Sequence, residues 1–304
     1  MIDNDAPEWG NLTVTQMRLA GPLDVAASLE PFRRSGDDLL DRWDGTTLAR
    51  TLHAAGRTIP YAVRPVGTRD APSVDVVVED LAALPAVVSA VRSTFVGDAA
   101  LLAALAAADP VIARLDLLYP GLRPVRQFDL LSSIVRCISA QQVNLNWAAT
   151  LRRRLAEAYG RRHVVGGHEV WSLDAATLAG ARVADIRALQ WTTRKAEYIV
   201  GVAAAIVEGE LDLEALRTLP DDEVIRRLTG VRGLGMWTAE SVLARTLGRP
   251  CVVAGDLAVR KAVGLAYLNE RLPSEEQVRA ASAHWGPAAG MAQTLVLRAL
   301  VIGE

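Results

Sequence analysis

The stretch "LTGVRGLGMWTA", residues 228–239, decides the fold, because it places three glycines between two segments of helical periodicity. Upstream, residues 221–231 carry apolar side chains at the spacing of one buried helix face, and Asp221 suits the start of a helix. Downstream, residues 237–247 repeat this periodicity, and Gly248 suits a helix C-terminus. The glycines therefore predict a tight turn between two short helices, with backbone N–H groups facing outward at the second helix's start. Such an N-terminus attracts phosphate.

Other motifs also use closely spaced glycines. A dinucleotide-binding fingerprint needs a preceding strand and a third glycine at the position that Thr238 occupies. A P-loop needs Gly-Lys followed by Ser or Thr, a triplet that this sequence lacks. A structural turn with C-capping glycines stays open for the motif taken alone, so residues elsewhere must decide.

Composition indicates a globular protein without a catalytic metal. The 304 residues are 51% hydrophobic and 22% charged, with a formal net charge of −2, and the length allows two or three domains. Two cysteines, Cys137 and Cys251, are too few for a four-cysteine cluster, and the four histidines lack ligand spacing. We therefore expect both cysteines in the core, no catalytic metal and no cofactor. No apolar run suits a membrane span, and residues 1–10 do not resemble a signal peptide, so we expect a cytoplasmic protein.

The pattern along the chain predicts an α+β fold. Residues 47–67 read as two strands around a turn near Gly56, and the other predicted elements before residue 97 are strands in 11–19 and 73–80 and helices in 23–34 and 82–95. From residue 97 onward, helical patterns follow one another between glycines and prolines. The prediction is a small mixed α/β N-terminal domain followed by an all-α body.

A second motif lies after the hairpin, where Asp256 in "GDLAVRKAVG" (255–264) precedes another helical pattern. By itself this aspartate is most simply an N-cap. The hairpin and the Gly-Asp motif together resemble the signature of the helix-hairpin-helix DNA glycosylases, specifically the 3-methyladenine DNA glycosylase II branch. The resemblance extends to "FDLLSSIVRCISAQQVN" (128–144), "TTRKAEYIVGVAAAI" (192–206) and "HWGPAAGMA" (284–292).

The resemblance implies an architecture and an activity. The implied domains are a mixed α/β cap at residues 1–105, a helical domain at 106–130 and 249–304 that carries the catalytic aspartate, and a helical domain at 131–248 that carries the hairpin. The implied activity is that of a monomeric, monofunctional glycosylase of base excision repair, which flips an alkylated purine such as 3-methyladenine out of double-stranded DNA and leaves an abasic site. It would act at the nucleoid. Two alternatives stay open: a glycosylase for deaminated purines such as hypoxanthine, and a non-catalytic DNA-binding protein.

The same resemblance assigns Asp256 as the catalytic residue. A carboxylate there stabilises the cation that develops on the deoxyribose and orients or deprotonates water. Its N-cap position is compatible, since a helix dipole favours a carboxylate. Trp237 stands where bifunctional relatives carry a Schiff-base lysine, and because tryptophan cannot form an imine we expect no lyase activity. Trp237 would line the base pocket, where an indole face attracts a cationic base by about 1–2 kcal/mol; a packed core tryptophan is the alternative.

The resemblance also implies further contacts with the DNA and the base. The implied DNA-binding residues are Gly233, Leu234, Gly235, Thr238, Gln141, Gln142 and Arg260. The hairpin would bind the backbone through main-chain donors, and the carbonyls of Gly233 and Gly235 are where a monovalent cation would bind. The glutamine pair would fill the gap that the flipped base leaves in the DNA double helix, with Gln142 at the tip. The alternative is that the two glutamines are simply the polar end of a protein helix.

Two pocket positions depart from the resembled pattern. Ser241 stands where well-known members place a tyrosine, and Leu297 replaces a second pocket tryptophan. Fewer aromatic rings imply a wider or differently selective pocket, unless Trp147, Trp191 or Tyr198 compensates. The arginine run at residues 150–162 either contacts phosphates or forms a solvated helix face.

Overall fold

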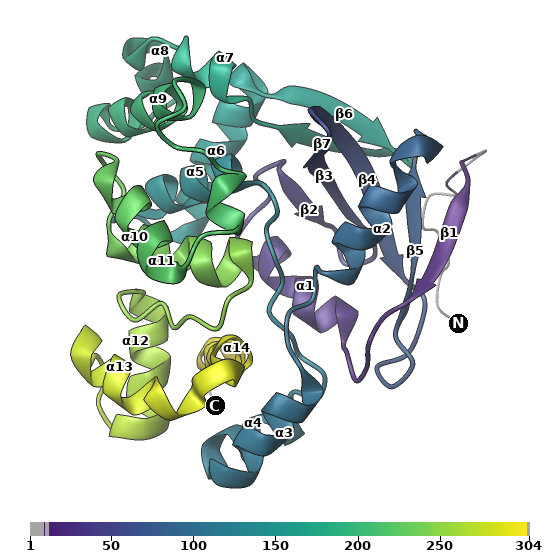
Figure 1. Cartoon of the computed structure of the whole chain (residues 1–304), viewed down its shortest axis with the longest axis vertical. Helices are drawn as coiled ribbons and strands as arrows, with labels where there is room; N and C mark the ends of the chain where they lie inside the picture. Colours follow the sequence, from purple (N-terminus) through teal and green to yellow (C-terminus); the bar gives the residue numbers. More distant parts are fainter. Residues whose placement is uncertain (1–8, 10–11, 303–304) are drawn as a thin grey trace.

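The computed structural model describes residue 9 and residues 12–302, and it divides into a sheet domain and a helical body (Figure 1). The sheet is antiparallel with the order β1-β5-β4-β3-β2. Its strands are β1 (Val14–Arg18), β2 (Asp41–Trp43), β3 (Leu48–Ala54), β4 (Arg57–Pro65) and β5 (Ser73–Val78). Apolar residues of the sheet form one core with those of α1 (Val25–Arg34) and α2 (Leu84–Arg92).

The β3–β4 hairpin confirms the predicted turn near Gly56. Ala55 and Gly56 both have positive φ, 49° and 71°, as a two-residue turn between antiparallel strands requires. The alternating burial of β5 likewise places Val74 and Val76 in the core beneath the helices. Local sequence pattern was sufficient here because turn and strand signals coincide.

The body consists mainly of short helices. Its elements are α3 (Ala99–Ala108), α4 (Pro110–Leu118), α5 (Leu130–Ala140), α6 (Leu145–Tyr159), α7 (Ala175–Ala179), α8 (Val183–Ala188), α9 (Thr193–Val207), η2 (Ala215–Arg217), α10 (Asp221–Gly230), α11 (Met236–Ser241), the π-helical η3 (Val242–Leu247), α12 (Leu257–Val263), the π-helical η4 (Gly264–Leu268), α13 (Glu275–Ser282), η5 (Ala283–Ala288) and α14 (Ala289–Ile302). The short η1 (Leu81–Ala83) precedes α2 and belongs to the sheet domain, where Ala83 is part of the core. No helix in the described part of the chain is long and apolar enough to cross a membrane.

The prediction of an all-α body is wrong at residues 161–172. These residues form an antiparallel hairpin of β6 (Arg161–Val165) and β7 (His168–Ser172). Gly166 and Gly167 make its turn with positive φ, which is a recognisable hairpin signal. An isolated two-stranded hairpin is only marginally stable in water, and this one is stabilised by packing on the sheet domain. Val165 shares a small apolar cluster with Ala62 and Val77, and the backbone amide of Trp171 donates to the Leu39 carbonyl at 2.8 Å.

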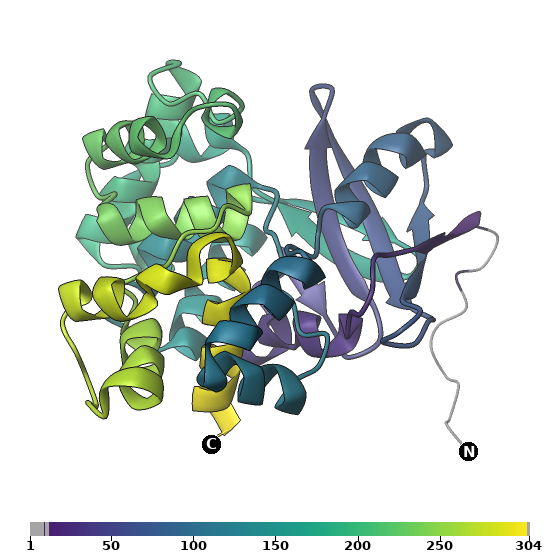
Figure 2. The same ribbon diagram turned by 60° about the horizontal axis from the view of Figure 1, so that its bottom comes forward.

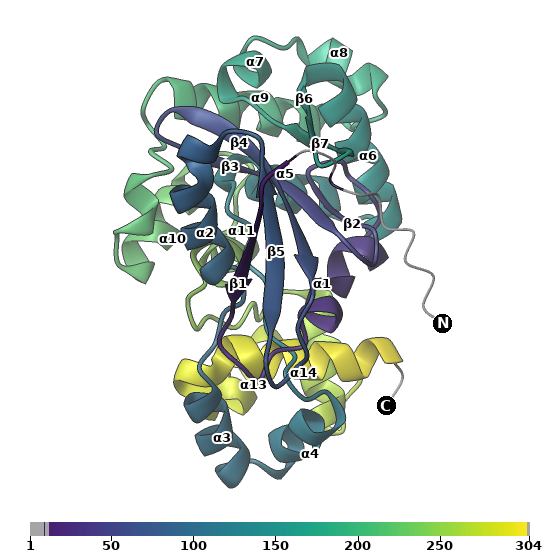
Figure 3. The ribbon, with the colours of Figure 1, turned by 90° about the vertical axis from the view of Figure 1, so that its right-hand side faces the viewer.

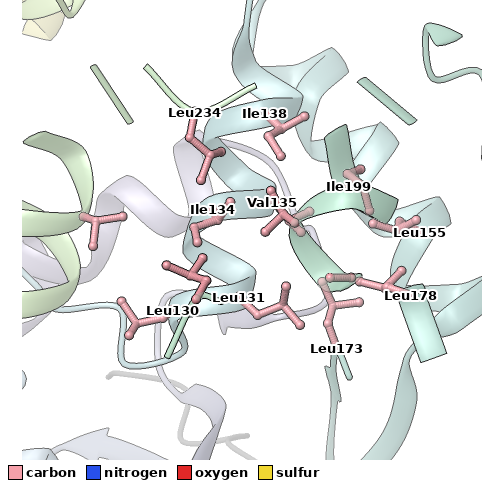
Figure 4. Packing of buried hydrophobic residues seen from close by; sticks show 14 of the residues in the cluster. Leu130, Leu131, Ile134, Val135, Ile138, Leu155, Leu173, Leu178, Ile199 and Leu234 are labelled. Carbon is pink, nitrogen blue, oxygen red and sulfur yellow. The ribbon is translucent and has the colours of Figure 1, made fainter. Parts of the chain in front are cut away.

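The body has two large cores among the described residues. The first joins α5 to α11, and Leu234 of the glycine turn points into it beside Ile134 and Ile138 (Figure 4). The second joins α3 and α4 to the helices after residue 250, and Figures 2 and 3 show these distant segments side by side. The division into domains by residue range stays a prediction; its boundary at residue 105 falls inside α3, whose Leu102 and Leu105 pack in this second core.

Candidate active site and hairpin

The glycine turn joins α10 to α11 as predicted, and α11 continues through η3 to Gly248, whose positive φ of 71° ends the helix. Gly235 is the N-cap of α11 and offers no side chain, so the first backbone N–H groups of the helix lack a side-chain cap. Leu234 is 4% exposed and Thr238 is 1% exposed. A ligand at this turn would therefore meet the main chain of these residues, not their side chains.

Glycine is required at position 233 by its surroundings. Gly233 has a φ of 96°, and a Cβ atom there would lie 2.3 Å from the ring of Tyr198 in α9. The Arg232 guanidinium lies 5.8 Å from the centre of the same ring and pairs with Glu197 at 3.2 Å. Residues of α9 therefore pack against the turn and support it. From the sequence, Tyr198 is predicted only as a substitute pocket residue, whereas in the structure it packs under the turn.

The C-terminal end of α5 holds the turn from another side. The side-chain amide of Gln141 donates to the Gly233 carbonyl at 3.2 Å, whereas Gln142, with a φ of 57°, is exposed in the loop between α5 and α6. The buried Lys195 ammonium donates to the Ser139 carbonyl at 2.8 Å and anchors the same helix end. The two glutamines therefore have different surroundings, and their DNA contacts stay predictions.

The two carbonyls expected to bind a monovalent cation each accept one hydrogen bond already. Gly233 accepts from Gln141, and Gly235 accepts from the Ala239 amide at 3.1 Å. A carbonyl oxygen has a second lone pair, so each of these two oxygens can still accept a further partner. That site stays a prediction. No cluster of metal-ligating side chains occurs within the described residues.

Asp256 begins α12 as predicted, and its two carboxylate oxygens have different partners. Oδ1 accepts from the amides of Ala258 and Val259 at 2.9 and 3.3 Å, which caps the helix. Oδ2 accepts from the Trp237 indole N–H at 3.2 Å and from Arg245 at 3.3 Å. The side chain of Asp256 is 15% exposed. The fold thus brings the predicted catalytic aspartate and the predicted pocket tryptophan together, with one oxygen directed away from the helix.

Arg245 is a residue that sequence analysis missed. Trp237, Ser241 and Arg245 follow one another at i, i+4 and i+8 along α11 and η3, so a helical spacing was the available signal. The π-helical segment changes the local register, a feature often found at functional sites. The Gln127 amide donates to the Arg245 carbonyl at 2.8 Å, and Arg126 donates to the Thr246 carbonyl at 3.1 Å, so the segment before α5 secures this helix end.

A buried thiol lies behind these residues. Cys137 of α5 is 7% exposed, as expected for a core cysteine, and lies beside Ser241, which is 2% exposed. Burial raises the pKa of the Cys137 thiol to about 11, although Arg245 opposes the shift. The thiol is therefore neutral at physiological pH and contributes packing and not a nucleophile.

The remaining predicted residues lie farther along the chain. Leu297 is half-buried on α14 and packs against the second core of the body, and its pocket role stays a prediction. Arg260 donates to the Pro273 carbonyl at 2.8 Å, which joins α12 to the loop before α13. In the arginine run, Arg152 is buried and pairs with Asp38 at 2.8 Å. That arginine is structural and does not belong to a solvated face.

Known proteins resemble this chain in sequence and in fold. It is 30% identical over 184 residues to a putative DNA-3-methyladenine glycosylase of Bacillus subtilis (strain 168), covering 60% of this chain and 63% of that protein. It is 32% identical over 130 residues to DNA-3-methyladenine glycosylase 2 of Escherichia coli (strain K12), covering 42% and 45%. The chain thus spans less than two thirds of the length of these curated relatives.

The whole fold has a counterpart among solved structures. A 3-methyladenine DNA-glycosylase from Archaeoglobus fulgidus superposes with a TM-score of 0.82 at 22% identity, covering 94% of this chain and 97% of that one. In sequence, residues 135–288, about half of the chain, match the family described as HhH-GPD superfamily base excision DNA repair protein. This matched region runs from α5 through the hairpin and Asp256 to η5. The chain therefore belongs to the HhH-GPD superfamily of base excision DNA repair proteins.

Proposed function

We propose that this protein is a monofunctional DNA glycosylase of the 3-methyladenine glycosylase II type, which removes alkylated purines from double-stranded DNA. The observation that carries the proposal is the contact between the Asp256 carboxylate and the Trp237 indole, at 3.2 Å. Trp237 lies in the first turn of α11, just after the glycine turn. The site therefore combines a turn that can hold the DNA backbone, an aromatic ring and, in contact with that ring, a carboxylate. The names of the sequence relatives support the same substrate class.

The proposed reaction uses these groups in separate roles. Free N–H groups at the start of α11 hold a phosphate, which fixes the DNA while the damaged nucleotide leaves the stack. The bond between the sugar and the base then breaks, and its electron pair leaves with the base. Asp256 stabilises the positive charge left on the sugar carbon and orients the water whose oxygen bonds to that carbon. An alkylated purine departs neutral, because it carries a positive charge beforehand, and the proton from water passes to the carboxylate and on to solvent.

Replacing Asp256 with asparagine tests this proposal. Asp256→Asn keeps an N-cap oxygen but removes the charge, so we expect base release from methylated duplex DNA to fall at least roughly 100-fold while DNA affinity changes little. Single-turnover base release and binding to a duplex with an abasic-site analogue measure the two effects. Asp98→Asn, which alters the exposed N-cap of α3, is the matched control and should retain wild-type rates.

Two results would contradict the proposal. Unchanged base release by Asp256→Asn would remove the catalytic role of this carboxylate. Binding of DNA by the wild type without release of any base would favour the non-catalytic DNA-binding protein.

A further inference from the structure

The Oδ2 atom of Asp256 accepts hydrogen bonds from two donors of different charge. The Trp237 indole is neutral, whereas the Arg245 guanidinium places a full positive charge 3.3 Å from Oδ2. The Arg245 side chain is 41% exposed, so it is accessible beside the carboxylate and is not sealed in the core. The site next to Trp237 therefore holds one negative and one positive group.

The position of Arg245 is built into the fold. Its own carbonyl accepts from the Gln127 amide, and the next carbonyl, that of Thr246, accepts from Arg126. Cys137 and Ser241 are buried beside the same helix and are uncharged at physiological pH. Among the described residues, Arg245 and then Asp256 are the charged groups that act most strongly on the Cys137 thiol, ahead of Arg136, which pairs with Asp38 and Asp41.

A guanidinium in this place affects cationic and neutral bases differently. A base with alkylated N3 or N7 carries a positive charge, which the carboxylate attracts and the guanidinium repels. A neutral base such as hypoxanthine carries no charge at first but takes the electron pair of the breaking bond and becomes negative as it leaves. A nearby fixed cation stabilises that developing charge.

We propose that Arg245 is a specificity-determining residue, which extends the range of this site from cationic, alkylated purines to neutral, deaminated ones. The inference rests on the proposed glycosylase function. The carbon–nitrogen bond breaks, its electron pair goes to the base, water supplies the oxygen that bonds to the sugar carbon, and the proton released from water neutralises the departing base. Arg245 supplies charge stabilisation and exchanges no proton.

The experiment compares two duplexes of one sequence, one with a single N7-methylguanine and one with a single hypoxanthine. Single-turnover rates of base release are measured for the wild type, Arg245→Met and Arg245→Lys at one pH and one salt concentration. We expect Arg245→Met to lower the ratio of hypoxanthine release to N7-methylguanine release roughly tenfold, because it removes the cation. Arg245→Lys keeps the charge and should keep the ratio within about twofold of the wild type.

Each other outcome has a defined meaning. Equal losses on both substrates in Arg245→Met would overturn the inference, because they indicate a role in placing Asp256 alone. So would a wild type that releases N7-methylguanine but no hypoxanthine. A wild type that releases neither base overturns the proposed function and this inference with it. Thermal unfolding confirms that the variants fold, and Arg245→Gln replaces Arg245→Met if that variant does not.

Discussion

Single residues in this site combine an observed structural role with a proposed chemical one. Asp256 uses Oδ1 to cap α12 and presents Oδ2 to Trp237 and Arg245. Capping fixes the carboxylate at a helix end, which is the placement that its proposed catalytic role requires. Trp237 in turn occupies the position that the resemblance assigns to a lysine in bifunctional relatives. A tryptophan there provides no amine for a Schiff base.

Trapping with borohydride tests the absence of lyase chemistry. We expect no covalent product when the protein is mixed with abasic-site DNA and borohydride, since Trp237 offers no amine and Lys195 is buried with its ammonium bonded to the Ser139 carbonyl. A lysine-dependent glycosylase is the positive control. A trapped complex would refute the expectation, and its loss in Lys195→Gln or Lys261→Gln would identify the amine.

At the scale of elements, the short hairpin depends on its neighbours. Helix α11 spans Met236–Ser241, too short to be stable alone, and it is held by Tyr198 beneath Gly233, by the Gln141 amide and by Leu234 in the core. The turn is thus placed by α5 and α9 together. A change in its backbone should therefore affect both folding and DNA binding.

Gly233→Ala tests this dependence. Its Cβ would meet the Tyr198 ring and its φ of 96° disfavours any other residue, so we expect a loss of roughly 1–3 kcal/mol in unfolding free energy and at least tenfold weaker DNA binding. Urea unfolding and binding to abasic-analogue duplex measure these effects. Gly230→Ala is the control, because nothing lies within 4 Å of a Cβ there. Wild-type stability and affinity in Gly233→Ala would show that the turn tolerates rearrangement.

At the scale of the whole molecule, buried ion pairs join the sheet domain to the body. Asp38 pairs with Arg136 of α5 at 3.0 Å and with Arg152 of α6 at 2.8 Å. Asp41 pairs with Arg136 at 2.7 Å and with Arg50 of β3 at 2.8 Å. All five side chains are at most 13% exposed. Breaking one partner of such a network leaves a buried charge uncompensated, which is strongly destabilising.

This network predicts acid-sensitive stability. Burial alone would raise the pKa of Asp38, but Arg136 and Arg152 outweigh it and hold this pKa below its usual value. A depressed pKa in the folded state stabilises the fold above the unfolded value of about 3.9, and that contribution is lost as pH falls through the folded pKa. We expect Asp38→Asn to lose roughly 3–5 kcal/mol at pH 7, by urea unfolding, and the difference from wild type to narrow below about pH 4.

The neighbouring carboxylate provides a matched control for this experiment. Asp37 pairs with Arg42 at 2.7 Å but is 38% exposed, so Asp37→Asn should cost no more than about 1 kcal/mol. A difference between wild type and Asp38→Asn that is independent of pH would show that the contribution of Asp38 does not come from its charge.

The sequence by itself determined the local features: the β3–β4 turn at Gly56, the hairpin glycines, the C-cap at Gly248 and the N-cap at Asp256. Each depends on backbone conformation within a few residues, where residue type is decisive. Only the tertiary structure decided which distant groups meet. Helical spacing places Arg245 on the face of Trp237, but the approach of α12 brings Asp256 between them. Tertiary packing likewise brings Gln141 to the Gly233 carbonyl while Gln142 stays exposed, and it stabilises the β6–β7 hairpin against the sheet domain. Such contacts between distant segments depend on the burial of whole helix and sheet faces, which a short stretch of sequence does not specify.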